Sequence, residues 1–445
     1  MSKSADLSDV IAEGWCIGCG ACIAAEKNLR LVLDPQRLIY RPSEPGGEAA
    51  ASVCPAVGVD FDELHRQRFP HAAPTPLGPV ESILLAQSTD HDRNIRASSG
   101  GVIRELLRAY LAEEGVTGAI VLDHLEGLRF EPRLLTDPNQ VDSLPGSIYH
   151  NIPFQNALRL LEQQDGRYVL VALPCQVEGI LKFLMHRRRE SLPRLHAIIG
   201  LVCGWTYSHH AVRAICWLKG WDADGIQDIA FRGGGPVGRL RMTFPDGERQ
   251  VSRRWDYDYL VAFDRSFNLP RCHLCVDHLN LLADIVVGDA WLPRVAHTKT
   301  GVSLVVCRTP ETAALMARLK SGGRIHSSHG READIVISQG HSLTYGDFAY
   351  AYAEYLSRAG RFHPHMLAAN RPAARPVSLG EAARFDREFA AKTRLQWDGR
   401  YRYLWLRKAI VDLPRYAYRF LKKHVRRAAA TRDVAAPDPA DVPFR

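Results

Sequence analysis

The sequence lacks the features of several large protein classes. No run of apolar residues approaches the roughly 18 that a membrane-spanning helix needs, and residues 1–15 contain no apolar stretch suited to secretion. No G-x-G-x-x-G motif follows a predicted strand and no Walker loop is present, which argues against a Rossmann dinucleotide site and a P-loop NTPase. We therefore expect a cytoplasmic protein without a membrane-spanning helix.

Acidic residues are scarce in one part of the chain. The 445 residues include 57 Lys and Arg against 49 Asp and Glu, a formal net charge of +8. Residues 392–432 contain 13 Lys and Arg but only 2 Asp and Glu, so the rest of the chain is slightly acidic. A basic surface is thus confined to the C-terminal region, and we expect no nucleic-acid partner.

The length of the chain predicts two or three domains.

Cysteine, by contrast, is abundant. In a reducing compartment, ten clustered cysteines favour metal or redox chemistry over disulfides. Residues 15–22 read WCIGCGAC, and a distant Cys-Pro follows in ASVCPA. This spacing is typical of a 4Fe–4S cluster, with glycines that let the backbone approach the sulfides and a remote Cys-Pro that supplies the fourth thiolate. Structural zinc is the competing interpretation, although zinc sites more often pair two Cys-x-x-Cys knuckles. We predict a 4Fe–4S cluster on Cys16, Cys19, Cys22 and Cys54.

A second group of cysteines is less decisive. Cys272 and Cys275 form another Cys-x-x-Cys, while Cys175 and Cys203 directly follow two runs that are typical of buried strands. These four could converge on a second cluster, or the latter two could be small buried side chains of the core. Two further cysteines lie inside apolar elements and are predicted to be core residues, Cys216 and Cys307.

Two polar turns are candidate ligand sites. One opens a strongly amphipathic helix and consists of Ser98, Ser99, Gly100 and Gly101. A Ser/Gly loop at a helix N-terminus suits a pyrophosphate, but it is equally compatible with an ordinary N-cap. The other ends the predicted strand in ADIVVGDAW, at an edge where ligands of α/β sheets tend to bind, and consists of Gly288, Asp289 and Ala290. Asp289 could contact a ligand or merely cap a turn.

The stretch FRGGGPVGRLRMTFPDG predicts a hairpin with glycine-rich and Pro-Asp-Gly turns. Arg232, Arg239 and Arg241 alternate along it. They could face an anionic ligand, but a solvated strand face is favoured.

The order of these motifs resembles one known family. SSGG with its helix and GAIV, then GSIY, ALPCQVEGILKFL, IGLVCG, FRGG, RCHLCVDHLNLLADIVVGDAW and GVSLVVCRT follow one another within residues 10–345. This order is similar to that of the coenzyme F420 hydrogenase/dehydrogenase beta-subunit family, F420 being a deazaflavin. With the N-terminal cysteine motif, the chain looks more like the two-cluster branch, which includes reductases of chlorophyll pigments.

The resemblance implies FAD and two 4Fe–4S clusters in one polypeptide. It assigns the second cluster to Cys175, Cys203, Cys272 and Cys275, and the flavin site to three loops, Ser98–Gly101, Pro174–Gln176 and Gly288–Ala290. A protonating side chain should lie over the flavin. The candidates are His150 and His278, although each is more often structural than catalytic.

Two functional hypotheses follow. The first is an FAD-dependent iron–sulfur oxidoreductase that passes electrons from reduced ferredoxin through both clusters to FAD and then to an organic small molecule. The alternative is an electron-transfer beta subunit of a larger flavin- or deazaflavin-linked hydrogenase or dehydrogenase complex. Whether the isolated chain turns over a substrate separates the two.

The expected fold is an α/β (α+β) catalytic core with an N-terminal ferredoxin-like 4Fe–4S module and a C-terminal helical basic extension. We expect the module at 1–75, the two parts of the family region at 76–165 and 166–345, the extension at 346–432 and a disordered tail at 433–445. Aromatic residues interleave with Arg and Lys in the extension. It could contact an anionic membrane surface or an acidic partner such as ferredoxin, or it could pack on the body as a solvated helix.

Overall fold

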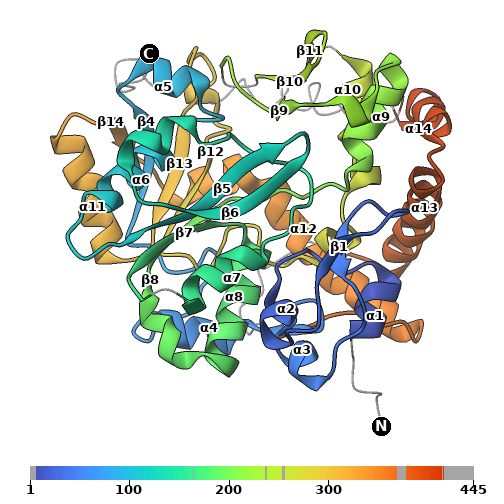
Figure 1. The fold of residues 1–445 in the computed structure, drawn as a ribbon, viewed down its shortest axis with the longest axis horizontal. Coiled ribbons are helices and arrows are strands. Elements are labelled where there is room, and N and C mark those ends of the chain that lie inside the picture. Colours follow the sequence, from blue (N-terminus) through green and yellow to red (C-terminus); the bar gives the residue numbers. More distant parts are fainter. Residues whose placement is uncertain are drawn as a thin grey trace, which may run out of the picture.

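The computed structural model describes residues 7–163, 165–235, 238–252, 256–367, 377–412 and 414. Its centre is an eight-stranded mixed sheet in the order β14-β4-β13-β12-β8-β7-β5-β6 (Figure 1). The strands are β4 (Ser82–Ser88), β5 (Gly118–Glu126), β6 (Arg129–Leu135), β7 (Tyr168–Ala172), β8 (Leu195–Leu201), β12 (Ile285–Asp289), β13 (Ser303–Cys307) and β14 (Ile325–His329). The four central strands β5, β7, β8 and β12 are parallel, and the outer strands are antiparallel. The predicted α/β core is confirmed.

Helices cover both faces of this sheet (Figure 1). On one face, α6 (Val102–Leu111) and α11 (Pro310–Ser321) share a core with Val169 of β7. On the other, α7 (Gln155–Gln163) and α8 (Pro174–Arg187) share a core with Leu170, the next residue along the strand. Successive side chains of a strand point to opposite faces. Burial on both faces therefore requires a continuous apolar run, which RYVLVAL provides after its arginine.

A smaller sheet contains the predicted hairpin. Its strands are β9 (Asp228–Ala230), β10 (Arg239–Phe244) and β11 (Gly247–Ser252), and it lies beside α9 (His210–Lys219) and α10 (Tyr257–Ala262). Arg239 and Arg241 are exposed, as expected for a solvated strand face. Arg232 differs, because it lies in the loop before β10 and is buried.

The N-terminal segment consists of short elements: α1 (Leu7–Glu13), α2 (Ala21–Ala25), β1 (Leu31–Leu33), β2 (Tyr40–Pro42), α3 (Glu48–Val53), β3 (Gly58–Asp60) and α4 (Phe61–Arg68). Strand β3 pairs in parallel with β15 (His365–Leu367), which lies far along the chain. Helix α12 (Glu332–Arg358) runs through the predicted boundary at residue 345. The ferredoxin-like character of this segment and the five-part division stay predictions.

The described part of the C-terminal extension packs on the body as α13 (Leu379–Trp397), α14 (Tyr401–Arg407) and a π-helical turn, Lys408–Asp412. Lys392 and Lys408 lie 3.6 and 3.2 Å from the carboxylate of Asp264, whose side chain is 9% exposed. Two of the basic residues therefore face inward. Tyr403, Leu406 and Ile410 remain exposed. The membrane or acidic-partner contact stays a prediction, and the predicted tail at 433–445 lies outside the described residues.

In the described ranges, no helix combines the length and the apolar character that crossing a membrane requires.

The Asp264 pair yields a test of stability. Burial alone would raise the pKa of Asp264, but Lys408 and Lys392 together hold it below the ordinary value of 3.8. A carboxyl with a lowered pKa in the folded state contributes stability above its unfolded pKa and loses that contribution as the pH falls through the folded value. We expect D264N to lower the free energy of unfolding at neutral pH by about 3–5 kcal/mol, because it leaves two lysines without their buried partner.

Denaturant titration between pH 3 and 7 checks this expectation. The matched control is D165N, since the Asp165 side chain is 97% exposed and should change stability by less than about 1 kcal/mol. Equal effects of the two variants at neutral pH would contradict the role of Asp264.

Candidate functional site: two cysteine quartets beside a loop-lined sheet edge

The four N-terminal cysteines form one group, in which Cys16 is half-buried and the other three are buried. Cys16 and Cys19 precede α2, Cys22 lies within it, and Cys54 directly follows α3. Burial raises the pKa of Cys16 to about 12, and the neighbouring Cys54 thiol adds to the rise. Burial and then Cys54 likewise raise the pKa values of Cys19 and Cys22. The predicted set therefore converges, and we call it the N-terminal quartet.

Backbone amides surround these sulfurs. The N–H of Gly18 donates to Cys16 Sγ at 3.5 Å. Further amides stabilise the charged forms of the other three, from Ala21 to Cys19, from Ile23 to Cys22, and from Ala56 and Val57 to Cys54. This is the arrangement that the glycines in the motif predict. Gly18 and Gly20 have φ values of 76° and 80°, a region where a Cβ is strained.

The second set of cysteines also converges. Cys175 lies in the first turn of α8, Cys203 follows β8, and Cys272 and Cys275 lie in and directly after the 3-10 helix Pro270–Leu274. Burial raises the pKa of Cys175, and Cys203, Cys275 and Cys272 all contribute to the rise. The N–H of Thr206 donates to Cys272 Sγ at 3.4 Å. We call this set the second quartet.

The donor chemistry of both quartets fits 4Fe–4S clusters. A bare group of buried thiols resists ionisation, whereas a metal cation favours the thiolate. Among the described residues, no three His, Cys, Asp or Glu side chains lie close enough together to hold a single metal ion. Thiolates around a cubane bind four different irons and lie farther apart than the ligands of one ion. Cys216 and Cys307 lie in the hydrophobic cores, as predicted.

The three predicted flavin loops lie along one edge of the sheet. Parallel strands bring their carboxyl ends to the same side, so Pro174–Gln176 after β7 and Gly288–Ala290 at the end of β12 share an edge. Loop 98–101 joins them through β13. The N–H of Gly100 donates to Ser303 Oγ at 3.0 Å, and Ser303 pairs with Asp289 in the sheet.

Several polar atoms of these loops are already engaged by the protein. Ser99 Oγ donates to Val302 O, and Ser98 Oγ accepts from the N–H of Ser147. The Gln176 side chain caps α8 by accepting from the N–H of Leu173 at 2.8 Å. The hydroxyls of Ser98 and Ser99 and the side-chain amide of Gln176 therefore stabilise the conformation of these loops.

An ion pair joins a buried arginine to this edge. Arg232 Nη1 lies 2.6 Å from Asp289 Oδ2, and Arg232 is 6% exposed. Burial would lower the pKa of Arg232, but Asp289, followed by Tyr149, raises it, so the guanidinium stays charged. Asp289 is therefore the partner of Arg232, a pairing that the sequence pattern did not predict.

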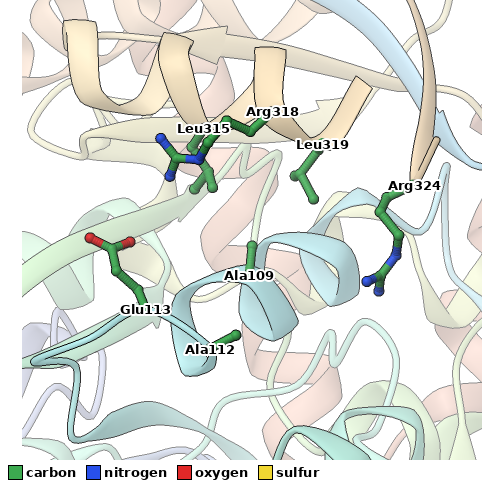
Figure 2. Close-up of a pocket in the computed structure, with 7 residues that line it drawn as sticks. All are labelled: Ala109, Ala112, Glu113, Leu315, Arg318, Leu319 and Arg324. Carbon is green, nitrogen blue, oxygen red and sulfur yellow. The ribbon is translucent and has the colours of Figure 1, made fainter. Parts of the chain in front are cut away.

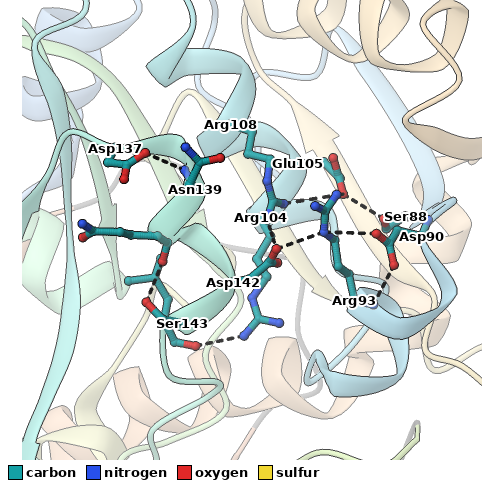
Figure 3. A network of polar contacts seen from close by, with 12 residues as sticks. Ser88, Asp90, Arg93, Arg104, Glu105, Arg108, Asp137, Asn139, Asp142 and Ser143 are labelled. Atoms are coloured by element: carbon teal, nitrogen blue, oxygen red, sulfur yellow. Dashed lines mark hydrogen bonds and ion pairs between the residues drawn. The ribbon is translucent and has the colours of Figure 1, made fainter.

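A polar network connects the segments on either side of loop 98–101 (Figure 3). Glu105 of α6 is 1% exposed, and its carboxylate accepts from Ser88 Oγ at 2.8 Å and pairs with Arg324 at 2.7 Å. Asp142 pairs with Arg93 of α5 (His91–Arg96) and with Arg108 of α6. These contacts fix the two helices that flank the loop.

The two candidate proton donors have other contacts. His150 is buried against the rings of His209 and Phe231, and burial followed by His209 lowers its pKa well below 6.5. His278 Nδ1 donates to Cys203 O at 2.8 Å, while the N–H of Cys203 donates to His278 O. His278 thus holds a predicted cluster ligand in place. Their proton-donor roles stay predictions.

A surface hollow of about 300 Å³ lies between α6 and α11 (Figure 2). Its lining consists of Ala109, Ala112, Glu113, Leu315, Arg318, Leu319 and Arg324. It contains no cysteine and no residue of the predicted flavin loops, so it does not belong to the candidate site.

Several residues that hold the site were missed by the sequence interpretation. Asn151 donates to Ile17 O and accepts from the N–H of Tyr40, which fastens the cysteine loop to the body. Asn280 donates to Ala172 O and Leu201 O and so joins the ends of β7 and β8. Single asparagines carry no spacing signal, so only the fold identifies them.

The glycines of the N-terminal loop make a direct test possible. A Cβ on Gly20 would overlap the backbone of Gln155, and its φ of 80° disfavours alanine in any case. We expect G20A to displace the loop and to lower the iron content from about eight to about four atoms per chain. Iron and sulfide analysis of protein purified without oxygen measures this, with G380A as the control because its added Cβ meets nothing closer than 3.8 Å. Unchanged iron in G20A would contradict the assignment of this loop.

Comparison with known proteins places the chain in a family. Residues 83–159 match the N-terminal model of "Coenzyme F420 hydrogenase/dehydrogenase, beta subunit", and residues 165–332 match its C-terminal model. An F(420)H(2) dehydrogenase subunit of Methanosarcina mazei is 25% identical over 303 residues, which cover 64% of this chain and 79% of the relative. The beta subunit of coenzyme F420 hydrogenase of Methanothermobacter thermautotrophicus is 25% identical over 244 residues, which cover 52% of this chain and 81% of that protein.

A solved structure of the F420-reducing NiFe hydrogenase complex from Methanosarcina barkeri contains a chain of similar fold. The TM-score is 0.50 at 17% identity, and the match covers 64% of this chain and 94% of that chain. The two adjacent family matches span the central sheet and the second quartet. The chain therefore belongs to the coenzyme F420 hydrogenase/dehydrogenase beta-subunit family.

Proposed function

We propose that this chain is an oxidoreductase of the electron-transfer type, the iron–sulfur and flavin subunit of a larger redox assembly. The observation that carries the proposal is the presence of two cysteine quartets, one of them at the sheet edge that the flavin loops share. When bound, 4Fe–4S clusters supply single-electron transfer, and a flavin converts between one-electron and two-electron chemistry.

The relatives favour this hypothesis over a self-sufficient reductase fed by ferredoxin. Both named relatives are subunits, one of an F(420)H(2) dehydrogenase and one of a coenzyme F420 hydrogenase. The alternative with ferredoxin as donor and a small organic molecule as substrate rests on the N-terminal quartet, which lies outside both family matches. A cluster on that quartet would be the point at which electrons from a donor enter the protein.

The chain's own residues have defined tasks in this proposal. The eight thiols hold the clusters, and backbone amides such as that of Gly18 stabilise charge on their sulfurs. Burial of Cys19, Cys22 and Cys54, each at most 7% exposed, keeps water from the N-terminal quartet. The ion pair of Arg232 with Asp289 holds the loop Gly288–Ala290, one of the three loops that would line the flavin.

Cysteine substitutions test the cluster assignment. We expect C22S and C203S each to lose the iron of one quartet, about four of about eight atoms per chain, and to retain the EPR signal of the other cluster. The matched control is C216S, a buried cysteine in the hydrophobic core outside both quartets. Equal iron loss in all three variants would show general destabilisation, and full iron in C203S would remove the second cluster from the proposal.

A turnover assay distinguishes a component of a larger assembly from a self-sufficient reductase. Purified holoprotein should exchange electrons with a viologen dye but should reduce no small organic substrate from reduced ferredoxin in the absence of partner proteins. Steady turnover by the isolated chain would favour the reductase instead. Flavin extraction and identification, run on the same sample, distinguishes FAD from a deazaflavin.

A further inference from the structure

Helix α8 lies between the two cysteine quartets and touches both. Cys175, in its first turn, belongs to the second quartet. Gly179, one turn further, contacts the N-terminal quartet, because a Cβ at this position would lie 2.8 Å from Cys19 Sγ and 3.6 Å from Pro55. Four residues of helix span about 6 Å along the axis, so the two quartets approach the same short stretch of α8.

The next turn of α8 also holds the N-terminal quartet. Lys182 Nζ donates to Cys54 O at 3.0 Å and to Gly58 O at 2.6 Å. These two carbonyls flank the loop that carries the fourth thiol. Figure 1 shows α8 beside α2 and α3, the helices on which this quartet is built.

A buried acidic side chain of α8 lies on the side of the second quartet. Glu178 is 1% exposed and lies 3.7 Å from Arg271, the residue before Cys272. Burial raises the pKa of Glu178 to about 8. Consecutive residues of α8, Glu178 and Gly179, therefore face the segment of Cys272 and the N-terminal quartet.

We propose that α8 is the spacer that fixes the separation of the two clusters, with Gly179 and Lys182 as positioning residues for the N-terminal one. Gly179 lets the Cys19 thiolate pack directly on the helix, and the Lys182 ammonium clamps the Cys54 loop while placing a positive charge beside that cluster. This inference rests on the proposed function, since it takes both quartets as cluster sites. One helix would then position both clusters between which the electron passes.

Lys182 can be tested by a redox potential. A nearby positive charge favours the more negative, reduced form of a cluster, so its removal makes reduction harder. We expect K182M to shift the midpoint potential of the N-terminal cluster to a more negative value and to leave that of the second cluster nearly unchanged. EPR-monitored titration measures both, with the two signals assigned from C22S and C203S. The matched control is R187M, which removes an exposed cation from the end of the same helix.

The variant K182R keeps the positive charge, so its N-terminal cluster should have the midpoint potential of the wild-type protein. If K182M loses the N-terminal cluster altogether, recovery of its iron in K182R still supports the clamp. Equal potentials in K182M and R187M, or loss of iron that K182R does not restore, would overturn the role of Lys182.

Gly179 can be tested by a spectroscopic signature. We expect G179A to perturb or lose the EPR signal of the N-terminal cluster while the signal of the second cluster, whose ligand Cys175 shares the helix, is retained. G380A serves as the control for a Gly-to-Ala change within a helix. An unchanged N-terminal signal would overturn the proposal, as would equal loss of both signals. Absence of iron in the wild-type protein would instead refute the proposed function, so the two failures are distinguishable.

Discussion

The convergence of eight buried or half-buried cysteines in two neighbouring groups is the constraint to which the rest of this structure conforms. Burial raises the pKa of each of the eight thiols, and neighbouring thiols add to the rise for all of them except Cys54 and Cys272. The thiols are therefore neutral as they stand, and a bound metal cluster would favour their thiolate forms. The surrounding loops already supply backbone amides to the sulfurs, and α8 supplies a lysine to the carbonyls around Cys54. The protein thus already provides hydrogen-bond donors and a cation that would stabilise negative charge on cluster-bound thiolates.

The central sheet explains how distant segments reach this region. Parallel strands end at one edge, so Cys175, Cys203 and the turn at Asp289 come together although they are far apart in the sequence. Antiparallel β13 then brings Ser303 beside Asp289 and, through Ser303, loop 98–101. The buried pair of Arg232 and Asp289 joins the smaller sheet to the same edge. The predicted flavin loops and the second quartet therefore meet at one edge of the sheet.

The C-terminal extension shows why local composition predicts a surface poorly. Its excess of Lys and Arg indicates an exposed basic helix, yet Lys392 and Lys408 turn inward to Asp264. Gln396 and Tyr401 add buried hydrogen bonds to Ser266 and His210. Much of α13 and α14 packs on the body, and among the described residues of α14 only part of the side chains, such as Tyr403 and Leu406, stays exposed.

The sequence by itself determined the features that depend on local spacing. The Cys-x-x-Cys-x-x-Cys loop with its glycines, the apolar strands, the amphipathic helix after Ser98–Gly101 and the hairpin could all be predicted, because each is set by neighbouring residues. The motifs alone left open whether Cys175 and Cys203 meet Cys272 and Cys275, and the family resemblance implied that they do. Only the tertiary structure decided the pairing of Arg232 with Asp289 and the place of α8 between the quartets. Those contacts arise from strand order and helix packing, which no short-range pattern encodes.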